Sequence, residues 1–474
     1  MTQPLSIRGV GAAASTLRLP AAAVNAGWGR QGGRGSSAVC AADEDSLTLG
    51  WQAAVTAIEA AGIRPDEIDG LWWGTSRPPF AEGPSQAYLA SALGLRAGIG
   101  GALLAGSQHS GIEALLGAWD AVAAGSAGTV LVIASDALVP SLGSAFEGRC
   151  GAAAVALVAA LDGGSASFTV RLQSTQPVLD RYRGDAEAET RDLYDSRLFR
   201  EEVFVPTVTA MAERLGASPD TRWSLPDPDG RMGSSVARKI TGQPPVSADI
   251  HAALGDTGAA ASLLGGLPAL GEPGPLAVIT YAAGRCTGVL AQVDSPVPGV
   301  HQALQALSRG REASYVEVLR ARRQLIAGGE TVEMAVPPGG AQFVRGNPEM
   351  LGLLGARCCD CGTVNTPPSI HPVCIACGGE KLEPVALSRR GVVHTYVVNY
   401  TMPAPFEAPL PLVVVDLDDG ARVMLQGVAP GEGIEIGAEV RLVLRRYTVE
   451  RGVPVYGYKA EAVAAVPANP EGGD

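Results

Sequence analysis

The sequence predicts a layered α/β body followed by a cysteine-rich segment and a small β-barrel. Apolar strands alternate with Ala-rich helices over the first three hundred residues. Five of the eight cysteines then fall between Cys358 and Cys377, and short strands separated by turns follow from Gly391 onward. A chain of 474 residues is too long for one hydrophobic core, so we expect two or three domains.

The first half of the body contains strands and helices in the order that a layered α/β fold needs. Residues 46–61 predict a helix, with Asp45 or Ser46 as its N-cap and Gly62 beyond its end. Residues 111–125 predict a second helix, because apolar residues recur there at helical spacing. Strands are expected over residues 71–73, 129–134 and 151–161. The run TVLVIA in the second of these suits a strand buried on both faces.

The second half of the body echoes the first only loosely. Residues 256–264 predict a helix start, and residues 276–281 predict a buried strand that enters the Gly-rich turn AAGRCTG. A charged helix is expected over residues 313–327. The predicted domains are two half-bodies at 1–165 and 166–330, a linker at 331–356, a cysteine-rich module at 357–385, a barrel at 386–466 and a disordered tail at 467–474.

Composition restricts the partners and the compartment. The net charge of −12 argues against nucleic-acid binding, since polyphosphate backbones repel such a surface. No apolar run reaches the length that crosses a bilayer, and MTQPLSIRGVGAAAS lacks the basic and apolar regions of a secretory signal. Because the cysteines cluster instead of spreading through a small domain, we expect metal binding in a reducing compartment, the cytoplasm.

The cysteine cluster has the spacing of a metal site. Cys358 and Cys361 form one CxxC pair, and after twelve intervening residues Cys374 and Cys377 form another. Two such knuckles complete a tetrahedral set of four thiolates, which suits Zn²⁺. Four protein ligands leave no open coordination position, so the predicted zinc is structural. Cys359 is a surplus thiol.

The C-terminal part, from Cys358 to about residue 465, resembles the zinc-ribbon/OB-fold proteins that accompany thiolases and hydroxymethylglutaryl-CoA synthases. The resemblance lies in RCCDCGTVNTPPSIHPVCIACGG, in GVVHTYVVNY and in PLVVVDLDDGARVMLQG. The short strands of this region predict an OB-like closed β-barrel. In that family the barrel docks on a thiolase-fold partner and helps to shape its acyl-CoA channel, so the resemblance implies the same pairing within this chain.

Residues 1 to about 330 resemble the hydroxymethylglutaryl-CoA synthase and ketoacyl synthase III branch of the thiolase superfamily. The matching segments are LPAAAVNAGWG, DEDSLTLGWQAAVTAIEAAGIRPDEIDGLWWGT, GDTGAAASLLGG and YAAGRCTG. The resemblance implies a thiolase-like αβαβα body, a homodimer and a coenzyme A thioester as substrate.

The residues that catalyse condensation in that family are replaced here. The family's nucleophilic Cys aligns with Gln108 in SQHSGIEAL, and its His aligns with Pro226 in LPDPDGR. Its Asn becomes Asp256, and the acid that serves as general base in the synthases becomes Ser76. Four changes in four separate motifs predict a degenerate condensing site.

Other groups near these positions remain as candidates for catalysis. Backbone donors at the start of the helix after Gln108 survive the substitution and can polarise an acyl carbonyl. The candidate helpers are Ser107, His109, Asp256 and Cys286. The competing interpretations are a packing role for His109, a helix cap for Asp256 and a buried inert thiol for Cys286. The packing role of His109 and the inert thiol at Cys286 are preferred, whereas the two roles of Asp256 are rated equally. The charged run RYRGDAEAETRDLYDSRLFREE is expected to be a solvated helix rather than a lid.

Three functional hypotheses follow. The leading one is an acyltransferase-like enzyme that passes an acyl group from acyl-CoA directly to an external carbon acid, amine or sulfur donor, the last giving a thiocarboxylic acid. The second is a decarboxylase or retro-aldol enzyme acting on an acyl-CoA. The third is a non-catalytic scaffold for a condensing enzyme. An acyl-CoA ligase, a sulfur carrier or a condensing enzyme is the expected protein partner.

Overall fold

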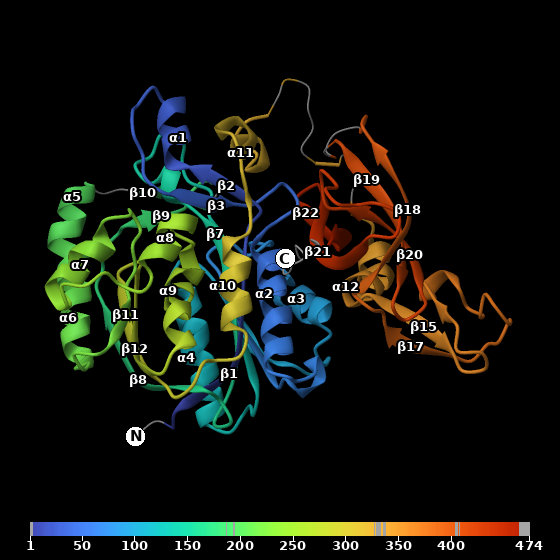
Figure 1. The fold of residues 1–474 in the computed structure, drawn as a ribbon, viewed down its shortest axis with the longest axis horizontal. Helices are drawn as coiled ribbons and strands as arrows, with labels where there is room; N and C mark the ends of the chain where they lie inside the picture. Colours follow the sequence, from blue (N-terminus) through green and yellow to red (C-terminus); the bar gives the residue numbers. More distant parts are fainter. Residues whose placement is uncertain are drawn as a thin grey trace, which may run out of the picture. The chain divides into compact units, whose positions relative to one another are not determined.

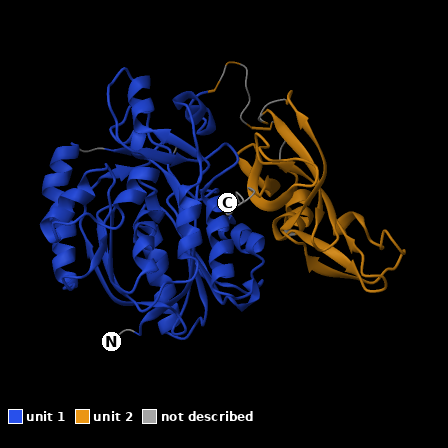
Figure 2. Ribbon diagram, in the orientation of Figure 1, with its two compact units in different colours: residues 1–325 blue, residues 326–474 orange. Residues whose placement is uncertain are grey.

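The computed structural model describes residues 3–463, except residues 186, 193–194, 327, 329–332, 335–337, 403–405 and 407. The chain divides into two compact units, residues 1–325 and 326–474 (Figure 2). Within the described ranges, no helix combines the length and the apolar character that crossing a membrane requires. The tail predicted at 467–474 lies outside the described residues.

The first unit is built on a nine-stranded sheet whose two halves repeat one topology (Figure 1). The two halves meet at their first strands, which pair in the middle of the sheet. From there toward either edge, the next two strand pairings are antiparallel and the third is parallel. The loose similarity between the two halves of the sequence therefore corresponds to a repeated strand topology. In spatial order the strands are β11 (Arg222–Ser224), β12 (Gly274–Ala282), β13 (Arg285–Val293), β8 (Ala166–Thr175), β1 (Leu5–Ala14), β7 (Ala152–Ala160), β6 (Val130–Ala137), β4 (Gly70–Gly74) and β5 (Gly100–Leu104).

Helices cover both faces of the strands and fill the middle of the unit. Helix α2 (Ser46–Ala60) packs on β1, β6 and β7, while α6 (Val205–Leu215) packs on β8, β12 and β13. Between them lie α4 (Ser110–Ala123) and α9 (Ala261–Gly266), which share one core with strands of both halves (Figure 1). This is the layered α/β body that the sequence predicts.

The remaining elements of the unit are short. Asp45 is the N-cap of α2 and accepts hydrogen bonds from the backbone N–H groups of Leu47 and Thr48, as one of the two expected caps. Of the charged helix expected over 313–327, the described residues 313–326 are helical over α11 (Tyr315–Ala321). The others are β2 (Leu17–Pro20), α1 (Ala21–Gly27), β3 (Ser36–Val39), α3 (Ser85–Leu93), β9 (Arg181–Tyr182), β10 (Arg191–Asp192), α5 (Ser196–Leu198), α7 (Met232–Ile240), α8 (Ala248–Leu254), α10 (Val300–Ser308) and β14 (Arg311–Glu312).

The second unit contains a small three-stranded sheet and a closed five-stranded barrel. The segment expected as a linker, 331–356, carries the helix α12 (Asn347–Gly352) and the start of β15. The small sheet consists of β15 (Leu354–Cys358), β16 (Val364–Asn365) and β17 (Leu382–Ala386). The barrel consists of β18 (Arg390–Asn399), β19 (Leu410–Leu417), β20 (Arg422–Gly427), β22 (Val453–Ala462) and β21 (Glu439–Glu450), which confirms the predicted barrel.

Two glycines fix the position of helix α4. A Cβ atom at Gly74 would overlap the carbonyl oxygen of Ser110, and one at Gly111 would overlap the carbonyl oxygen of Ala259. The first turn of α4 therefore lies directly against the end of β4 and against the turn before α9. This packing places the residues that precede α4 at the carboxyl ends of the strands.

We expect Gly111→Ala to destabilise the first unit by about 1–3 kcal/mol or more, because the added methyl group meets backbone that cannot move aside. Gly117→Ala in the same helix is the matched control, since its Cβ would approach only the Trp72 side chain, at 3.1 Å. Alanine also favours a helix over glycine by about 1 kcal/mol. Unfolding midpoints measure both variants, and equal midpoints would contradict the close approach.

Candidate functional site

A cavity of about 190 Å³ opens beside the residues that precede helix α4. Strands β4, β5 and β6 run parallel, so their carboxyl ends meet at one edge of the sheet, where α/β proteins place their ligands. Residues after β4 and β5, the turn after β12 and the hairpin β9–β10 supply the walls. The lining residues are Ser76, Arg77, Gly106, Ser107, Gln108, Asp180, Arg181, Tyr182, Arg183, Thr190, Ala282 and Ala283.

The structure places Ser107 and Gln108 in the cavity wall and turns His109 away from it. The His109 side chain is fully buried, and its Nε2 atom lies 2.9 Å from the Thr287 hydroxyl. Burial, with a smaller effect of the Arg285 charge, lowers the pKa of the His109 imidazole to about 3. The imidazole is therefore neutral at pH 7, and its position favours the packing interpretation.

Asp256 reaches the cavity through an arginine that the sequence analysis did not single out. The Arg181 guanidinium forms an ion pair with the Asp256 carboxylate, and these side chains are only 9% and 8% exposed. The same Nη1 atom lies 3.5 Å from Gln108 Oε1, and Nη2 donates to the Pro228 carbonyl at 2.9 Å. Asp256 also accepts a hydrogen bond from the Gly258 backbone N–H at 3.0 Å. Its carboxylate therefore both stabilises the turn before α9 and forms the ion pair with Arg181.

Cys286 lies on the opposite face of the sheet from the cavity. Neighbouring residues of a strand point to opposite faces. In β13, Thr287 points toward His109, whereas Cys286 belongs to the core beneath α6 and α7. Burial raises the pKa of the Cys286 thiol to about 12. The structure thus does not bring Cys286 together with Gln108, and among the described lining residues there is neither a cysteine nor a histidine.

A carboxyl group lies one hydrogen bond away from Ser76, the position of the expected general base. The Ser76 hydroxyl donates to Asp136 Oδ2 at 2.6 Å, and the Ala259 backbone N–H donates to the same oxygen at 3.0 Å. Burial raises the pKa of Asp136 above its ordinary value. Pro226, at the position of the family's His, is buried and outside the cavity lining.

The arginines of the cavity carried no signal in the sequence. Arg181 and Arg183 belong to a run of mixed charge that was expected to be solvated, and Arg183 and Arg191 are indeed exposed. Only the fold of the β9–β10 hairpin, in which Arg191 pairs with Tyr182, turns Arg181 inward. The solvated helix expected over the whole run is wrong for its first part, where β9 and β10 lie, whereas residues from Ser196 onward are helical.

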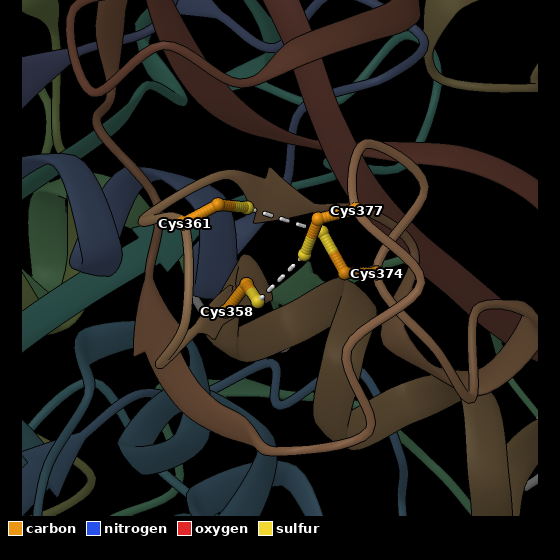
Figure 3. Close-up of side chains that lie close together, drawn as sticks. All are labelled: Cys358, Cys361, Cys374 and Cys377. Atoms are coloured by element: carbon orange, nitrogen blue, oxygen red, sulfur yellow. Dashed lines mark hydrogen bonds between the residues drawn. The ribbon is translucent and has the colours of Figure 1, made fainter.

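The four predicted metal ligands lie together in the second unit (Figure 3). Their sulfur atoms are all within 4.8 Å of one another. Cys358 and Cys377 are 3.6 Å apart, and Cys361 and Cys374 are 3.5 Å apart. Sulfur atoms bound to a tetrahedral Zn²⁺ at about 2.3 Å would be about 3.8 Å apart, so the arrangement fits that ion.

Each CxxC pair is shaped by the glycine that follows it. The Gly362 N–H donates to the Cys358 carbonyl at 2.9 Å, and the Gly378 N–H donates to the Cys374 carbonyl at 2.9 Å. Both glycines have a positive φ, +78° and +75°, which other residues rarely adopt. The surplus Cys359 is exposed and is not among the clustered thiols.

Comparison with known proteins identifies the C-terminal barrel. Residues 384–445 match the family model of the C-terminal OB-fold domain of ChsH2. A DUF35 domain-containing scaffold protein of Methanocaldococcus jannaschii is 37% identical over 117 residues, which are 23% of this chain and 82% of that protein. The chain belongs to the DUF35 domain-containing family. Its DUF35 domain is fused to a body of another kind.

The body is like hydroxymethylglutaryl-CoA synthases. The Pyrococcus horikoshii enzyme is 33% identical over 121 residues, but the match spans only 26% of this chain and 35% of that enzyme. A solved structure of HMG-CoA synthase complexed with CoA covers 70% of this chain and 92% of its own, with a TM-score of 0.58 and 17% identity. The chain thus combines a thiolase-like α/β body with the DUF35 domain, as the sequence predicts.

We expect His109→Gln to flatten the acid sensitivity of the first unit. Between pH 6.5 and about 3, the His109 imidazole binds a proton in the unfolded chain but not in the folded chain. The free energy of unfolding therefore falls as the pH is lowered, by at most about 1.4 kcal/mol per pH unit. Unfolding midpoints at pH 8 and pH 5.5 measure the effect. His301→Gln on the exposed part of α10 is the control. Identical pH dependence in H109Q and the wild-type chain would contradict a buried neutral imidazole.

Proposed function

We propose that the body binds an acyl-CoA thioester in the cavity beside Gln108 and passes the acyl group directly to an external nucleophile. One observation carries this proposal: Gln108 lines the cavity directly before α4, and no thiol lines it among the described residues. The likeness to HMG-CoA synthases, one of them solved with CoA, supports a thioester as substrate. An amide cannot attack a thioester, so no acyl-enzyme forms at this position.

The orientation of the Gln108 amide follows from its neighbour. A guanidinium has only donors, so the contact with Arg181 Nη1 assigns Oε1 to the side of the arginine. The Gln108 NH₂ group then remains for the thioester carbonyl oxygen. A donor that is already in place where negative charge develops stabilises the tetrahedral intermediate.

The proton of the incoming nucleophile also has an acceptor. The Ser76 hydroxyl lines the cavity and is bonded to Asp136, whose pKa is raised by burial. As the nucleophile–carbon bond forms and the carbon–sulfur bond breaks, a proton moves through Ser76 to Asp136 and then to the coenzyme A thiolate. A carbon acid, an amine and a hydrosulfide all satisfy this balance, and the last yields a thiocarboxylic acid.

A non-catalytic scaffold is the second candidate function. It is supported by the relative named as a scaffold protein, which matches over most of its own length. A scaffold would bind acyl-CoA or a condensing enzyme without turnover. The homodimer and the cytoplasmic location expected from the sequence stay predictions.

We expect no covalent acyl group on the protein after incubation with acyl-CoA, and intact-mass spectrometry detects any adduct directly. With a competent nucleophile, free coenzyme A should appear, and Gln108→Ala should lower its rate about 10²-fold or more. Arg238→Gln, on the exposed face of α7, is the control. An acyl adduct on any residue refutes direct transfer, whereas tight binding without turnover by any nucleophile class supports the scaffold.

Gln108→Cys is not expected to restore condensation, because Pro226 and Asp256 also depart from the family's acid–base set and such a set works as a unit.

We propose further that Cys358, Cys361, Cys374 and Cys377 hold a structural Zn²⁺, which supplies cross-linking between the two CxxC knuckles. Purified protein should contain about one zinc per chain. Cys374→Ser should lose the metal and lower the unfolding temperature of the second unit. Cys359→Ser, one residue from a ligand, should do neither. Equal zinc content in the two variants, or an iron–sulfur spectrum, would rule the assignment out.

A further inference from the structure

Three arginines face a small cavity in an acidic protein. Arg77, Arg181 and Arg183 line it, whereas Asp180 is the one acidic residue among the described lining residues. The chain as a whole carries a net charge of −12, so this gathering of guanidinium groups is local. Asp256 balances the charge of Arg181, and Asp136 lies near Arg77.

Arg77 is the least satisfied of the three. Its Nη2 atom donates to the Ala188 carbonyl at 2.6 Å, while its Nη1 atom is buried and has no hydrogen-bond partner in the described part of the chain. A buried donor without an acceptor costs about 1–3 kcal/mol, and more when the group is charged. Arg77 lines the cavity, so a turn of its guanidinium toward the cavity would bring this donor to an anionic ligand atom.

The neighbouring groups favour a singly charged ligand over a more highly charged one. Asp136 accepts from the Ser76 hydroxyl and the Ala259 N–H, and Asp180 accepts from the Ala283 N–H. Among the described residues, neither carboxyl group forms an ion pair with Arg77 or Arg183. Arg183 donates to the Glu187 carbonyl at 3.1 Å, which holds its side chain at the hairpin. The positive charge left in the wall is that of one or two guanidinium groups, whose planar N–H pairs match a carboxylate.

The size of the cavity limits what carries the charge. The cavity measures about 190 Å³ and is partly open to solvent. A short carboxylate chain suits this space better than the bulky nucleotide part of coenzyme A.

We infer that this cavity binds a carboxylate, carried either by the end of the acyl chain of the thioester or by a small acid that serves as the nucleophile. The inference rests on the proposed function, because it assigns the substrate class of the same site. Arg77 and Arg183 bind the carboxylate, and Arg181 holds Gln108 and Asp256 in place beside it.

Isothermal titration with matched thioesters tests the inference. Glutaryl-CoA and valeryl-CoA have the same number of acyl carbons and differ by the carboxylate. If the acyl chain carries the acid, glutaryl-CoA should bind about tenfold or more tightly than valeryl-CoA. If the nucleophile carries it, succinate should bind to the protein saturated with valeryl-CoA, and the two thioesters should bind equally. Inorganic phosphate is the competing anion.

Variants connect the preference to the arginines. Arg77→Gln should abolish the preference for the carboxylate ligand. Arg183→Gln should reduce this preference, and because Arg183 is exposed its replacement does not endanger folding. Arg238→Gln should leave it unchanged.

The inference is overturned if the two thioesters bind equally and succinate does not bind, if phosphate binds more tightly than the carboxylates, or if folded R183Q and R77Q retain the full preference. Absence of binding by both thioesters instead overturns the proposed function, and succinate binding to the free protein then still decides for or against the carboxylate site.

Discussion

The Arg181 guanidinium lies where three segments of the body meet. It pairs with Asp256 before helix α9, contacts Gln108 before helix α4 and donates to the Pro228 carbonyl. Its other face lies over the Phe146 ring, 4.3 Å from the ring centroid. Breaking a buried ion pair by removing one partner typically costs about 3–5 kcal/mol, since a charge is left without compensation. The wall of the cavity therefore depends on this one side chain.

This ion pair changes what the site can do. A glutamine held by a guanidinium is a fixed hydrogen-bond donor rather than a nucleophile, and its neighbour His109 is sealed into the core as a neutral ring. Apart from Gly106, Ala282 and Ala283, the remaining residues of the wall are charged or carry a hydroxyl group. They suit binding, orientation and proton transfer, which are the tasks that the proposed direct transfer requires.

The sequence predicted the regular elements because their signals are local. Asp45 with the apolar spacing after it marks α2, and the two CxxC pairs mark the thiol cluster. Gln108 and Ser107 were found because a resemblance fixed their place before a helix. Cys286 was a candidate for the same reason, but its face of the sheet depends on a register that the sequence leaves open.

The arginines could not be found in this way. Arg181 and Arg191 stand in one hydrophilic run, and only the pairing of β9 with β10 separates the buried one from the exposed one. Asp136 follows the apolar run of β6 and resembles an ordinary polar strand end until Ser76 and Ala259 are brought to it. Interactions between segments far apart in the chain decide both cases.

The most direct test of acyl transfer beside Gln108 is a crystal structure of the full chain with a bound acyl-CoA. Direct transfer predicts an intact thioester with its carbonyl oxygen within hydrogen-bonding distance of the Gln108 NH₂ group. Electron density that joins the acyl carbon to a protein atom, or a thioester bound away from Gln108, would contradict it.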